Sequence, residues 1–464
     1  MTNNTILIIG AGLSGSLLAL RLAKKGYQVE VREARKDLRI ADISAGKSIN
    51  LAFSDRGIKA LTSAGIIDKV MPICIPMKGR LIHDIKGNTF FSAYSGRGDK
   101  HINSISRGDL NAILMDESEK YPNLKILFEN ECKKVNLKKN IAHFYNHKTN
   151  KKEQVKARII FGADGAGSAL RKSMFKQREV LFSFSQQWLK HGYKELSFPA
   201  SKNGEFLTEK NALHIWPRGT YMLIALPNLD GSFTVTLFLP HNDGKYSFKS
   251  LNTTKKITHF FKEQFPDALE LMPNLLTEFK ENPVGNLGTI KCSPYTYKGK
   301  TLLIGDAAHA VVPFYGQGMN ASFEDVTVLF KYIDLYPDNW KKIFSEYEKE
   351  RKKDADAIGD LAVENFYEMR DHVANPLFKI KRELERKLEQ KYPDTYFSKY
   401  SMVTFNDSIS YSQAMLKGNA QDKAFLNLIE DKKIDTSTEI SKLLQKINSE
   451  TQRIIADDKT AHLQ

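Results

Sequence analysis

The stretch Gly10-Ala11-Gly12-Leu13-Ser14-Gly15 decides the fold of this chain of 464 residues. It follows the short apolar run 5–9, which predicts a buried parallel strand, and it opens into 17–23, whose apolar spacing predicts a helix. Gly10 permits the tight turn, Gly12 lets the backbone approach a pyrophosphate, and Gly15 allows the helix to pack closely on the strand. We therefore predict a Rossmann-like, dinucleotide-binding start to the chain.

An acidic residue completes this motif. The next predicted strand, 28–31, ends just before Glu33, about twenty residues beyond the glycines, where a carboxylate can bind ribose hydroxyls. The helix that begins near Leu13 offers free N–H groups to a phosphate. A glycine-rich turn without a ligand is the alternative, but strand, helix and acid in this order favour a binding site.

Two later stretches return the chain to the same domain. Gly162-Ala163-Asp164-Gly165 and Gly305-Asp306-Ala307-Ala308-His309 each follow a short apolar run that predicts a buried strand. Asp306, at the end of its strand, can accept hydrogen bonds from polyol hydroxyls, whereas Asp164 with Gly165 could equally form a plain turn. Gly316 and Gly318 bring backbone close to a flat ring, and a helix from about Met319 to Tyr332 directs its positive end toward it.

The predicted organisation is α/β. A discontinuous nucleotide-binding domain comprises 1–70, 100–180 and 296–340, and an antiparallel-sheet, substrate-binding domain comprises 71–99 and 181–295, where segments 220–227 and 232–239 alternate. A C-terminal helical region follows over 341–464. Its segments 355–372 and 376–391 carry apolar stripes that should pack on the sheet domain, 344–353 is its most polar part, and the residues from about 431 predict a solvated or partly disordered tail.

Composition restricts the function classes. The chain has 69 Lys and Arg against 54 Asp and Glu, a net charge of +15 that could attract nucleic acid, anionic lipid or an anionic cofactor. The lysines are scattered without an aromatic-interleaved basic stripe, so a lysine-rich surface and no nucleic-acid partner are expected. Cys74, Cys132 and Cys292 have no ligand spacing, which predicts reduced thiols and neither disulfide nor metal site.

No run of eighteen apolar residues and no signal-peptide pattern occur, and 420–464 is polar. A cytoplasmic protein without a transmembrane segment is therefore expected, acting as a monomer or homodimer.

Together, the three glycine-containing stretches resemble the three fingerprints of the single-component FAD-dependent aromatic hydroxylases. Further likeness to that family runs over about 5–415 and is carried by 48–52, 75–83, 214–218, 313–320 and 402–405. The resemblance implies FAD as prosthetic group, NADPH and O₂ as co-substrates, and hydroxylation of L-kynurenine at ring position 3 through a flavin C4a-hydroperoxide, in tryptophan degradation. The alternatives are a related flavin hydroxylase or NADPH oxidase acting on another aromatic substrate, and a flavin-binding sensor without turnover.

The resemblance also implies site residues. FAD contacts are expected at Leu13, Glu33, Arg35, Ala52, Arg107, Asp306, Met319 and Asn320, together with Gly10, Gly12, Gly15, Asp164 and Gly318 from the motifs. Arg107 could otherwise be an ordinary surface arginine. Phe314, Tyr315 and Gly316 of the flavin loop are the candidate catalytic residues. There is no second GxGxxG, which fits NADPH that binds only transiently.

The expected substrate contacts are Arg80, Tyr94, Asn365 and Tyr400. An arginine fork grips a carboxylate in two places, and tyrosine hydroxyls can add donors to the same group. Asn365 and Glu368 are three residues apart and share a helix face, so Glu368 is expected to assist ammonium binding, with a solvated surface charge as the alternative. For the aromatic ring we expect an apolar slot lined by Ile224 and Phe238, with Leu213, Ile215, Met222, Leu226 and Phe314, all of which could equally be core residues.

Overall fold

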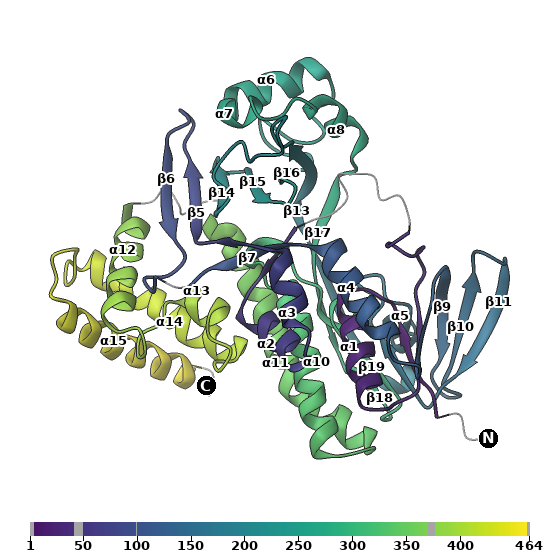
Figure 1. Cartoon of the computed structure of the whole chain (residues 1–464). Helices are drawn as coiled ribbons and strands as arrows, with labels where there is room; N and C mark the ends of the chain where they lie inside the picture. Colours follow the sequence, from purple (N-terminus) through teal and green to yellow (C-terminus); the bar gives the residue numbers. More distant parts are fainter. Residues whose placement is uncertain (1–3, 41–49, 99, 370–375, 462–464) are drawn as a thin grey trace. The chain divides into compact units, whose positions relative to one another are not determined.

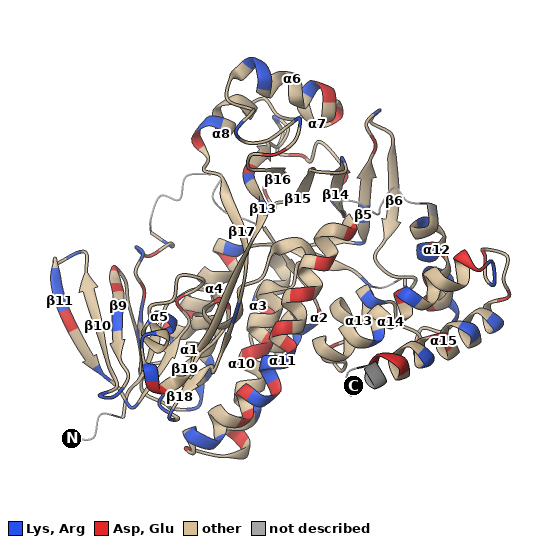
Figure 2. Ribbon diagram, turned by 180° about the vertical axis from the view of Figure 1, so that it is seen from behind, with Lys and Arg blue, Asp and Glu red and all other residues tan. Residues whose placement is uncertain are grey.

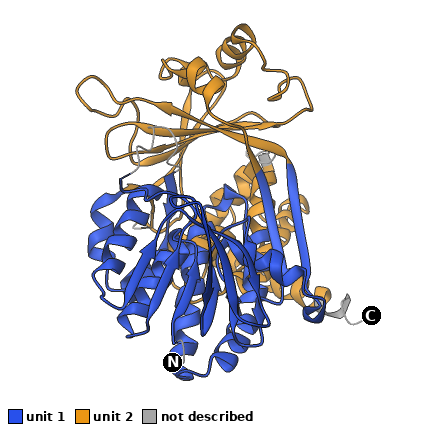
Figure 3. Cartoon of the chain, turned by 90° about the vertical axis from the view of Figure 1, so that its right-hand side faces the viewer, with its two compact units in different colours: residues 1–74, 105–189, 287–359 blue, residues 75–104, 190–286, 360–464 orange. Residues whose placement is uncertain are grey.

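A computed structural model describes residues 4–40, 50–98, 100–369 and 376–461 (Figure 1). The chain forms two compact units (Figure 3). Unit 1 comprises 1–74, 105–189 and 287–359, and unit 2 comprises 75–104, 190–286 and 360–464. The predicted fold class is confirmed, because one unit contains a mainly parallel sheet of Rossmann type and the other contains a mainly antiparallel sheet followed by C-terminal helices.

Unit 1 is built on a six-stranded sheet. Its strand order is β18 (Thr296–Tyr297), β19 (Thr301–Leu303), β12 (Ile159–Gly162), β1 (Ile6–Ile9), β2 (Val29–Arg32) and β8 (Leu124–Leu127). All neighbours are parallel except β18 and β19. Ile9 lies opposite Gly162, and Gly162 lies opposite Leu303, so the carboxyl ends of β1, β12 and β19 meet at one edge. The three glycine-containing turns that follow these strands are thereby brought together.

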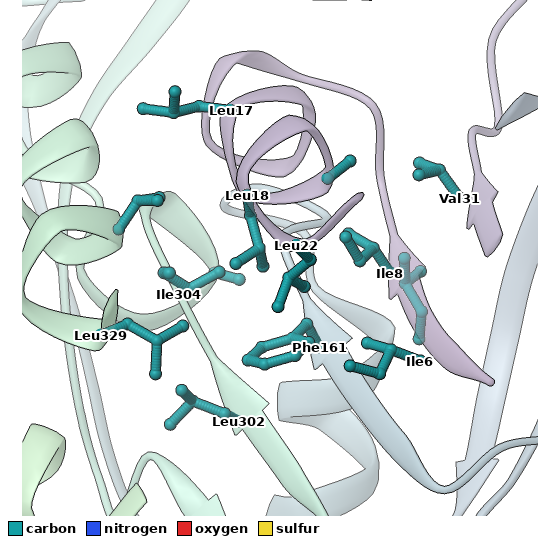
Figure 4. Close-up of a cluster of buried hydrophobic side chains, with 14 of the residues drawn as sticks. Ile6, Ile8, Leu17, Leu18, Leu22, Val31, Phe161, Leu302, Ile304 and Leu329 are labelled. Atoms are coloured by element: carbon teal, nitrogen blue, oxygen red, sulfur yellow. The ribbon is translucent and has the colours of Figure 1, made fainter. Parts of the chain in front are cut away.

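Helices cover the sheet of unit 1 and close its core. They are α1 (Leu13–Lys24), α2 (Asp55–Ser63), α3 (Ile67–Val70), α4 (Arg107–Glu119), α5 (Ala169–Phe175), α9 (Asp306–His309), α10 (Gly318–Leu335) and the first twenty residues of α11 (Trp340–Tyr367). Leu18, Phe161 and Leu302 are fully buried in the resulting cluster (Figure 4). Each such side chain contributes roughly 1.5–3 kcal/mol by leaving water. The predicted helix near 319–332 corresponds to α10.

Unit 1 also contains elements that the sequence patterns did not predict. Strands β9 (Asn130–Asn136), β10 (Ile141–Asn146) and β11 (Lys151–Lys156) form a separate antiparallel sheet. The other short elements are β3 (Asn50–Phe53), β4 (Cys74–Met77), β7 (Ile102–Ser106) and the 3₁₀ turns η1 (Met71–Ile73), η2 (Arg178–Val180) and η3 (Pro313–Tyr315); β4 and β7 each have residues in both units.

The principal sheet of unit 2 has seven strands. Their order is β17 (Gly285–Ser293), β13 (Ser183–Phe198), β16 (Phe233–Pro240), β15 (Met222–Pro227), β14 (Ala212–Pro217), β5 (Gly79–His83) and β6 (Thr89–Ala93), and β13 and β17 extend into unit 1. One face packs against α6 (Thr254–Gln264), α7 (Pro266–Leu269) and α8 (Leu275–Glu281) around Trp216 and Phe260. Strand β5 pairs in parallel with β14, whereas β14, β15, β16 and β13 alternate in direction.

The C-terminal helices correct two predictions. Helix α12 (Pro376–Lys391) buries its apolar stripe against α14 (Tyr411–Glu430) and α15 (Ile440–Ala461), not against the sheet. The polar tail is a helix, as one of the two predicted alternatives had it, but it is packed, because Leu443 and Ile447 of α15 are fully buried while Lys442 and Lys446 are exposed. Figure 2 shows basic and acidic residues along the same helix. Helix α13 (Lys399–Thr404) precedes α14.

Segment 355–372 also differs from the prediction. It is not a separate helix, since 355–367 continues α11, and 370–372 lies outside the described residues. Within the described part of the chain, no helix is both long and apolar enough to cross a bilayer.

Candidate functional site

The glycines of the first motif have different neighbours. Gly10 has φ +102°, and a Cβ there would lie 2.5 Å from the Ala163 carbonyl oxygen, which follows β12. A Cβ on Gly15 would overlap the Gly10 carbonyl oxygen. A Cβ on Gly12, in contrast, would meet no described protein atom within 4 Å. The fold itself therefore requires Gly10 and Gly15, whereas Gly12 borders open space that a pyrophosphate fits.

A buried carboxylate holds this loop in place. Glu33 Oε2 accepts a hydrogen bond from the Ala11 N–H at 2.8 Å, and Oε1 accepts bonds from the backbone N–H and the Nε of Arg35 at 3.0 and 2.8 Å. Burial alone would raise the pKa of Glu33, but the contacts with Arg35 lower it below its ordinary value. Glu33 and Arg35 are thus adjacent at the end of β2, and the carboxylate stays ionised.

Asn111 supports the same loop and was not predicted. Its Nδ2 donates to the Ala11 carbonyl oxygen at 3.0 Å, and Ser16 Oγ donates to the same oxygen at 3.1 Å. The sequence signal that could have indicated this role is the polar Asn111 next to Leu110 and Leu114, which form the buried face of α4.

In the part of the chain that the structure describes, the N-termini of α1 and α10 in unit 1 lack both a side-chain cap and an acidic residue. Among the described residues, no side chain caps α1 at Gly12 or α10 at Gln317, and neither first turn contains an acid. Free N–H groups and the helix dipole make such ends suitable for anions. The end of α1 carries Leu13 and suits a phosphate, and the end of α10 carries Gly318 and Met319 and suits an electron-rich ring edge.

Asp306 and Arg107, expected from the resemblance, interact. Burial raises the pKa of the Asp306 carboxyl, and the Arg107 guanidinium and His309 lower it. The side chains of Asp306 and Arg107 are both exposed to solvent. An accessible carboxylate that is nevertheless closely surrounded by protein suits a polyol ligand.

The side chain of Asn320 holds the loop before α10 through three hydrogen bonds to the backbone. Asn320 Nδ2 donates to the carbonyl oxygens of Ala52 and Gly316 at 2.8 and 2.9 Å, and Oδ1 accepts from the Ser54 N–H at 3.0 Å. A Cβ on Gly316 would lie 2.8 Å from Ala52 Cβ. Asn320 therefore joins Ala52 and Gly316 through backbone contacts. Phe314, Tyr315 and Met319, in the same segment, are buried. Ser48 and Ile49, which precede β3, lie outside the described residues.

Asp164 serves the turn in which it stands. Its Oδ2 accepts from the Ala169 N–H at 2.7 Å and so caps α5. Burial raises the pKa of Asp164, and Oδ1 is buried without a partner among the described residues. The plain-turn interpretation therefore accounts for Oδ2, and a contact of Asp164 with FAD stays a prediction.

Unit 2 brings Arg80, Tyr94 and Tyr400 together. The two tyrosine rings stack with centroids 5.4 Å apart, and the Arg80 guanidinium lies 5.0 Å from the Tyr400 centroid and 5.7 Å from that of Tyr94. Burial raises the pKa of Tyr94 far above its ordinary value, so its hydroxyl keeps its proton. In the described chain, Arg80 Nε and the Tyr94 hydroxyl are buried without a partner in hydrogen-bonding geometry. Unpaired buried donors of this kind indicate a site for an acceptor.

Helical residues of unit 2 surround this group with charge. Arg382, which was not predicted, donates from Nη2 to the Tyr94 carbonyl oxygen at 3.3 Å and lies 6.0 Å from the Tyr400 centroid. The sequence offered only an arginine within the amphipathic segment 376–391, and its half-buried position is seen in the structure. Burial alone would lower the pKa of Lys399, but the carboxylates of Asp422 and Glu368 raise it. Glu368 therefore belongs to a charged cluster and is only partly exposed. Asn365 is buried, and its Nδ2 lies 3.4 Å from Met369 Sδ.

Strand register sets the apolar face. Arg80 lies opposite Leu213, Ile82 opposite Ile215, Ile215 opposite Ile224, and Met222 opposite Phe238. Residues that oppose one another, or lie two apart on a strand, share a face. Arg80, Ile224 and Phe238 are therefore on one face, opposite to the face that packs on α6–α8. The alternation predicted a shared face for the apolar residues.

Known proteins share this architecture. The FAD binding domain family matches residues 3–362. The structure of 2-methyl-3-hydroxypyridine-5-carboxylic acid oxygenase is similar, with a TM-score of 0.64 and 18% identity, covering 85% of this chain and 99% of that one. That of p-nitrophenol 4-monooxygenase from Pseudomonas putida has a TM-score of 0.65 and 16% identity, covering 84% and 95%. These likenesses define an FAD-binding fold, in agreement with the glycine-containing turns and the N-termini of α1 and α10 in unit 1.

Sequence relatives narrow the class. Kynurenine 3-monooxygenase of Dictyostelium discoideum is 47% identical over 91% of this chain and 92% of its own length. The enzymes of that name from Flavobacterium psychrophilum and Myxococcus xanthus are 45% and 44% identical, covering 95% and 90% of this chain and 97% and 89% of theirs. The chain belongs to the kynurenine 3-monooxygenase family.

Proposed function

We propose that this protein hydroxylates L-kynurenine to 3-hydroxy-L-kynurenine, with consumption of one NADPH, one proton and one O₂ and release of NADP⁺ and water. The observation that carries the substrate is the group of Arg80 and Tyr94, in which Arg80 Nε and the Tyr94 hydroxyl are buried without a partner in hydrogen-bonding geometry among the described residues. An α-amino acid supplies the carboxylate that they lack. When bound, FAD supplies the redox chemistry, taking two electrons from NADPH and passing them to O₂.

The proposed FAD site consists of the three glycine-containing turns of unit 1 and the N-termini of α1 and α10. The N–H groups at Gly12 and Leu13 receive the pyrophosphate, and Glu33 with Arg35 holds the adenosine end. Arg107 and Asp306 bind the phosphate and polyol part. The N-terminus of α10, with Gly318, Met319 and Asn320, favours negative charge on the flavin ring. Gly10, Gly15 and Asp164 shape the turns, as their contacts indicate.

The sheet face of unit 2 is the proposed substrate site. Arg80 binds the amino-acid carboxylate through its planar fork, and the hydroxyls of Tyr94 and Tyr400 donate to the same group. Glu368 and Asn365 receive the ammonium, and Ile224 with Phe238 contacts the aromatic ring. Because the aniline nitrogen already activates the carbon beside it, the protein needs to orient the ring and exclude water but not to deprotonate it.

The flavin loop has a separate proposed role. Phe314, Tyr315 and Gly316 keep the ring environment dry, since both aromatic residues are buried and Gly316 is fixed by Asn320. We further propose a cytoplasmic location, because free thiols at Cys74, Cys132 and Cys292 suit a reducing compartment. A monomer or homodimer is proposed alongside it.

Anaerobic reduction by NADPH, with and without L-kynurenine, followed by admission of air, tests the function. We expect faster flavin reduction with the amino acid, followed by a product heavier by one oxygen atom. Hydrogen peroxide without that product would indicate an oxidase or another ring substrate, and a flavin spectrum without turnover would indicate a sensor.

Variants of Arg80 and Tyr400 test whether these residues bind the substrate and not FAD. Arg80→Ala leaves buried partners unpaired at a cost of about 2–5 kcal/mol, so we expect the KM for L-kynurenine to rise by roughly thirtyfold or more while FAD is retained. Tyr400→Phe should raise it by roughly fivefold, because one hydrogen bond contributes about 1 kcal/mol. Arg386→Ala, at an exposed position of α12, is the matched control. An Arg80→Ala enzyme with normal KM, or one purified without flavin, would contradict the proposal.

A further inference from the structure

We propose that Asp325, acting with His309 and Arg351, is a positioning residue that fixes the Gly305–Asp306 turn for FAD binding. The inference rests on the proposed role of Asp306 in holding FAD. It concerns a buried group of side chains in unit 1 that the proposed mechanism does not use, and of which only His309 belongs to a sequence motif.

A single carboxylate secures both ends of the one-turn helix that carries Asp306. Asp325 is fully buried on α10, and its Oδ2 accepts from the Gly305 N–H at 2.9 Å and faces His309 Nε2 at 2.6 Å. Gly305 precedes α9 and His309 is its last residue. Asp325 therefore sets the length and direction of this turn.

A second set of contacts holds Asp325 itself. Arg351, 1% exposed, donates from Nε to Asp325 Oδ1 at 2.9 Å and from Nη1 to Glu324 Oε2 at 2.7 Å. Glu324 also pairs with Arg56 of α2. Buried charges are tolerated when they are paired, and removal of one member leaves an uncompensated charge. The buried network of Arg56, His309, Glu324, Asp325 and Arg351 therefore links the helices α2, α9, α10 and α11.

The turn needs such support. Gly305 has φ +61°, and a Cβ there would lie 2.5 Å from Ser14 Oγ on α1. Within the described chain, no side chain or backbone group hydrogen-bonds to the Asp306 carboxylate, so its direction follows from the backbone that Asp325 holds. His309 also lowers, and Asp325 raises, the pKa of the Asp306 carboxyl, after burial and Arg107. Position and electrostatics at Asp306 both depend on the network.

The test compares four variants for FAD affinity, flavin midpoint potential and substrate KM. Asp325→Asn keeps the shape but removes charge and acceptor capacity, and His309→Gln replaces the imidazole ring by a flexible, neutral amide. Asp306→Asn tests the role of the turn. Glu30→Gln is the matched control, because Glu30 and Arg32 also form a buried pair, at 2.6 Å, in the same unit without touching the turn.

We expect Asp325→Asn to raise the Kd for FAD at least tenfold, as measured by quenching of FAD fluorescence on the apoprotein, and to shift the midpoint potential of the saturated protein. His309→Gln should raise the Kd several-fold. With FAD saturating, the KM for L-kynurenine should stay within twofold, and Glu30→Gln should leave FAD affinity within twofold although it lowers stability.

Three outcomes would overturn the inference: unchanged Kd and potential in Asp325→Asn and His309→Gln, equal loss of affinity in Glu30→Gln, or a KM that rises with the Kd. If Asp325→Asn does not fold, His309→Gln decides alone. If Asp306→Asn also binds FAD normally, the proposed role of the turn fails; if Asp306→Asn alone weakens binding, only the present inference fails.

Discussion

At the scale of single residues, Gly12 and Gly15 separate ligand binding from folding. Gly12 has φ −72° and ψ −177°, which alanine adopts readily, and a Cβ there meets no described atom within 4 Å. We expect Gly12→Ala to leave apoprotein stability unchanged or raise it by about 0.4–1 kcal/mol, but to weaken FAD binding at least tenfold, because the methyl group occupies the pyrophosphate space. Gly15→Ala should lower stability, since its Cβ overlaps the Gly10 carbonyl. Urea unfolding and FAD titration measure both; equal destabilisation by the two changes would count against this distinction.

Residues that belong to a motif of fixed spacing were predictable from sequence, and residues whose partners are selected by tertiary packing were not. Gly10 and Glu33 belong to a strand–turn–helix pattern with fixed spacing, which restricts their geometry. Asn111 reaches Ala11 over 100 positions, and Arg351 reaches Asp325 over 26 positions from a different helix. Their partners are selected by tertiary packing, for which periodicity gives no register. Arg80 was predicted as a substrate contact through family resemblance alone, and the geometry of its contacts with the rings of Tyr94 and Tyr400 required the structure.

At the scale of elements, a chain of hydrogen bonds joins β5 to β14 behind Arg80. His214 Nε2 donates to the Glu209 carbonyl oxygen at 2.7 Å, so Nδ1 is left to accept from His83 Nε2 at 3.0 Å. His83 Nδ1 faces Asp267 Oδ2 at 2.8 Å, and Trp216 Nε1 donates to the same oxygen at 2.8 Å. A second proton on His214 would set two N–H groups against each other. The motif residues His83, His214 and Trp216 therefore fix the register of two strands.

This arrangement predicts a pH dependence of stability. Burial lowers the pKa of His214 from 6.5 to about 4. The unfolded chain therefore binds a proton below about pH 6.5 that the folded chain refuses until about pH 4. The free energy of unfolding should be greatest above pH 6.5 and fall by up to about 3 kcal/mol as the pH approaches 4. His214→Asn, which keeps an acceptor for His83, should flatten the profile between pH 6.5 and 5. Urea titrations across this range test it, with exposed His259→Gln as control; an unchanged slope in His214→Asn would exclude His214 as the source.

At the scale of the whole molecule, the two units should respond to different ligands. The proposed FAD contacts all belong to unit 1, and the proposed kynurenine contacts all belong to unit 2. A ligand slows exchange through local opening by the factor 1 + [L]/Kd, about a hundredfold at 100 times the Kd. Hydrogen exchange followed by mass spectrometry should show that FAD protects peptides of 6–24 and 301–325 in the apoprotein. L-Kynurenine, added to the FAD-loaded protein, should mainly protect 79–94 and 212–240. Arg80→Ala is the control, because it should abolish the second effect and preserve the first. Protection of 212–240 by FAD alone, equal to that of 6–24, would show that cofactor and substrate contacts are not divided between the units.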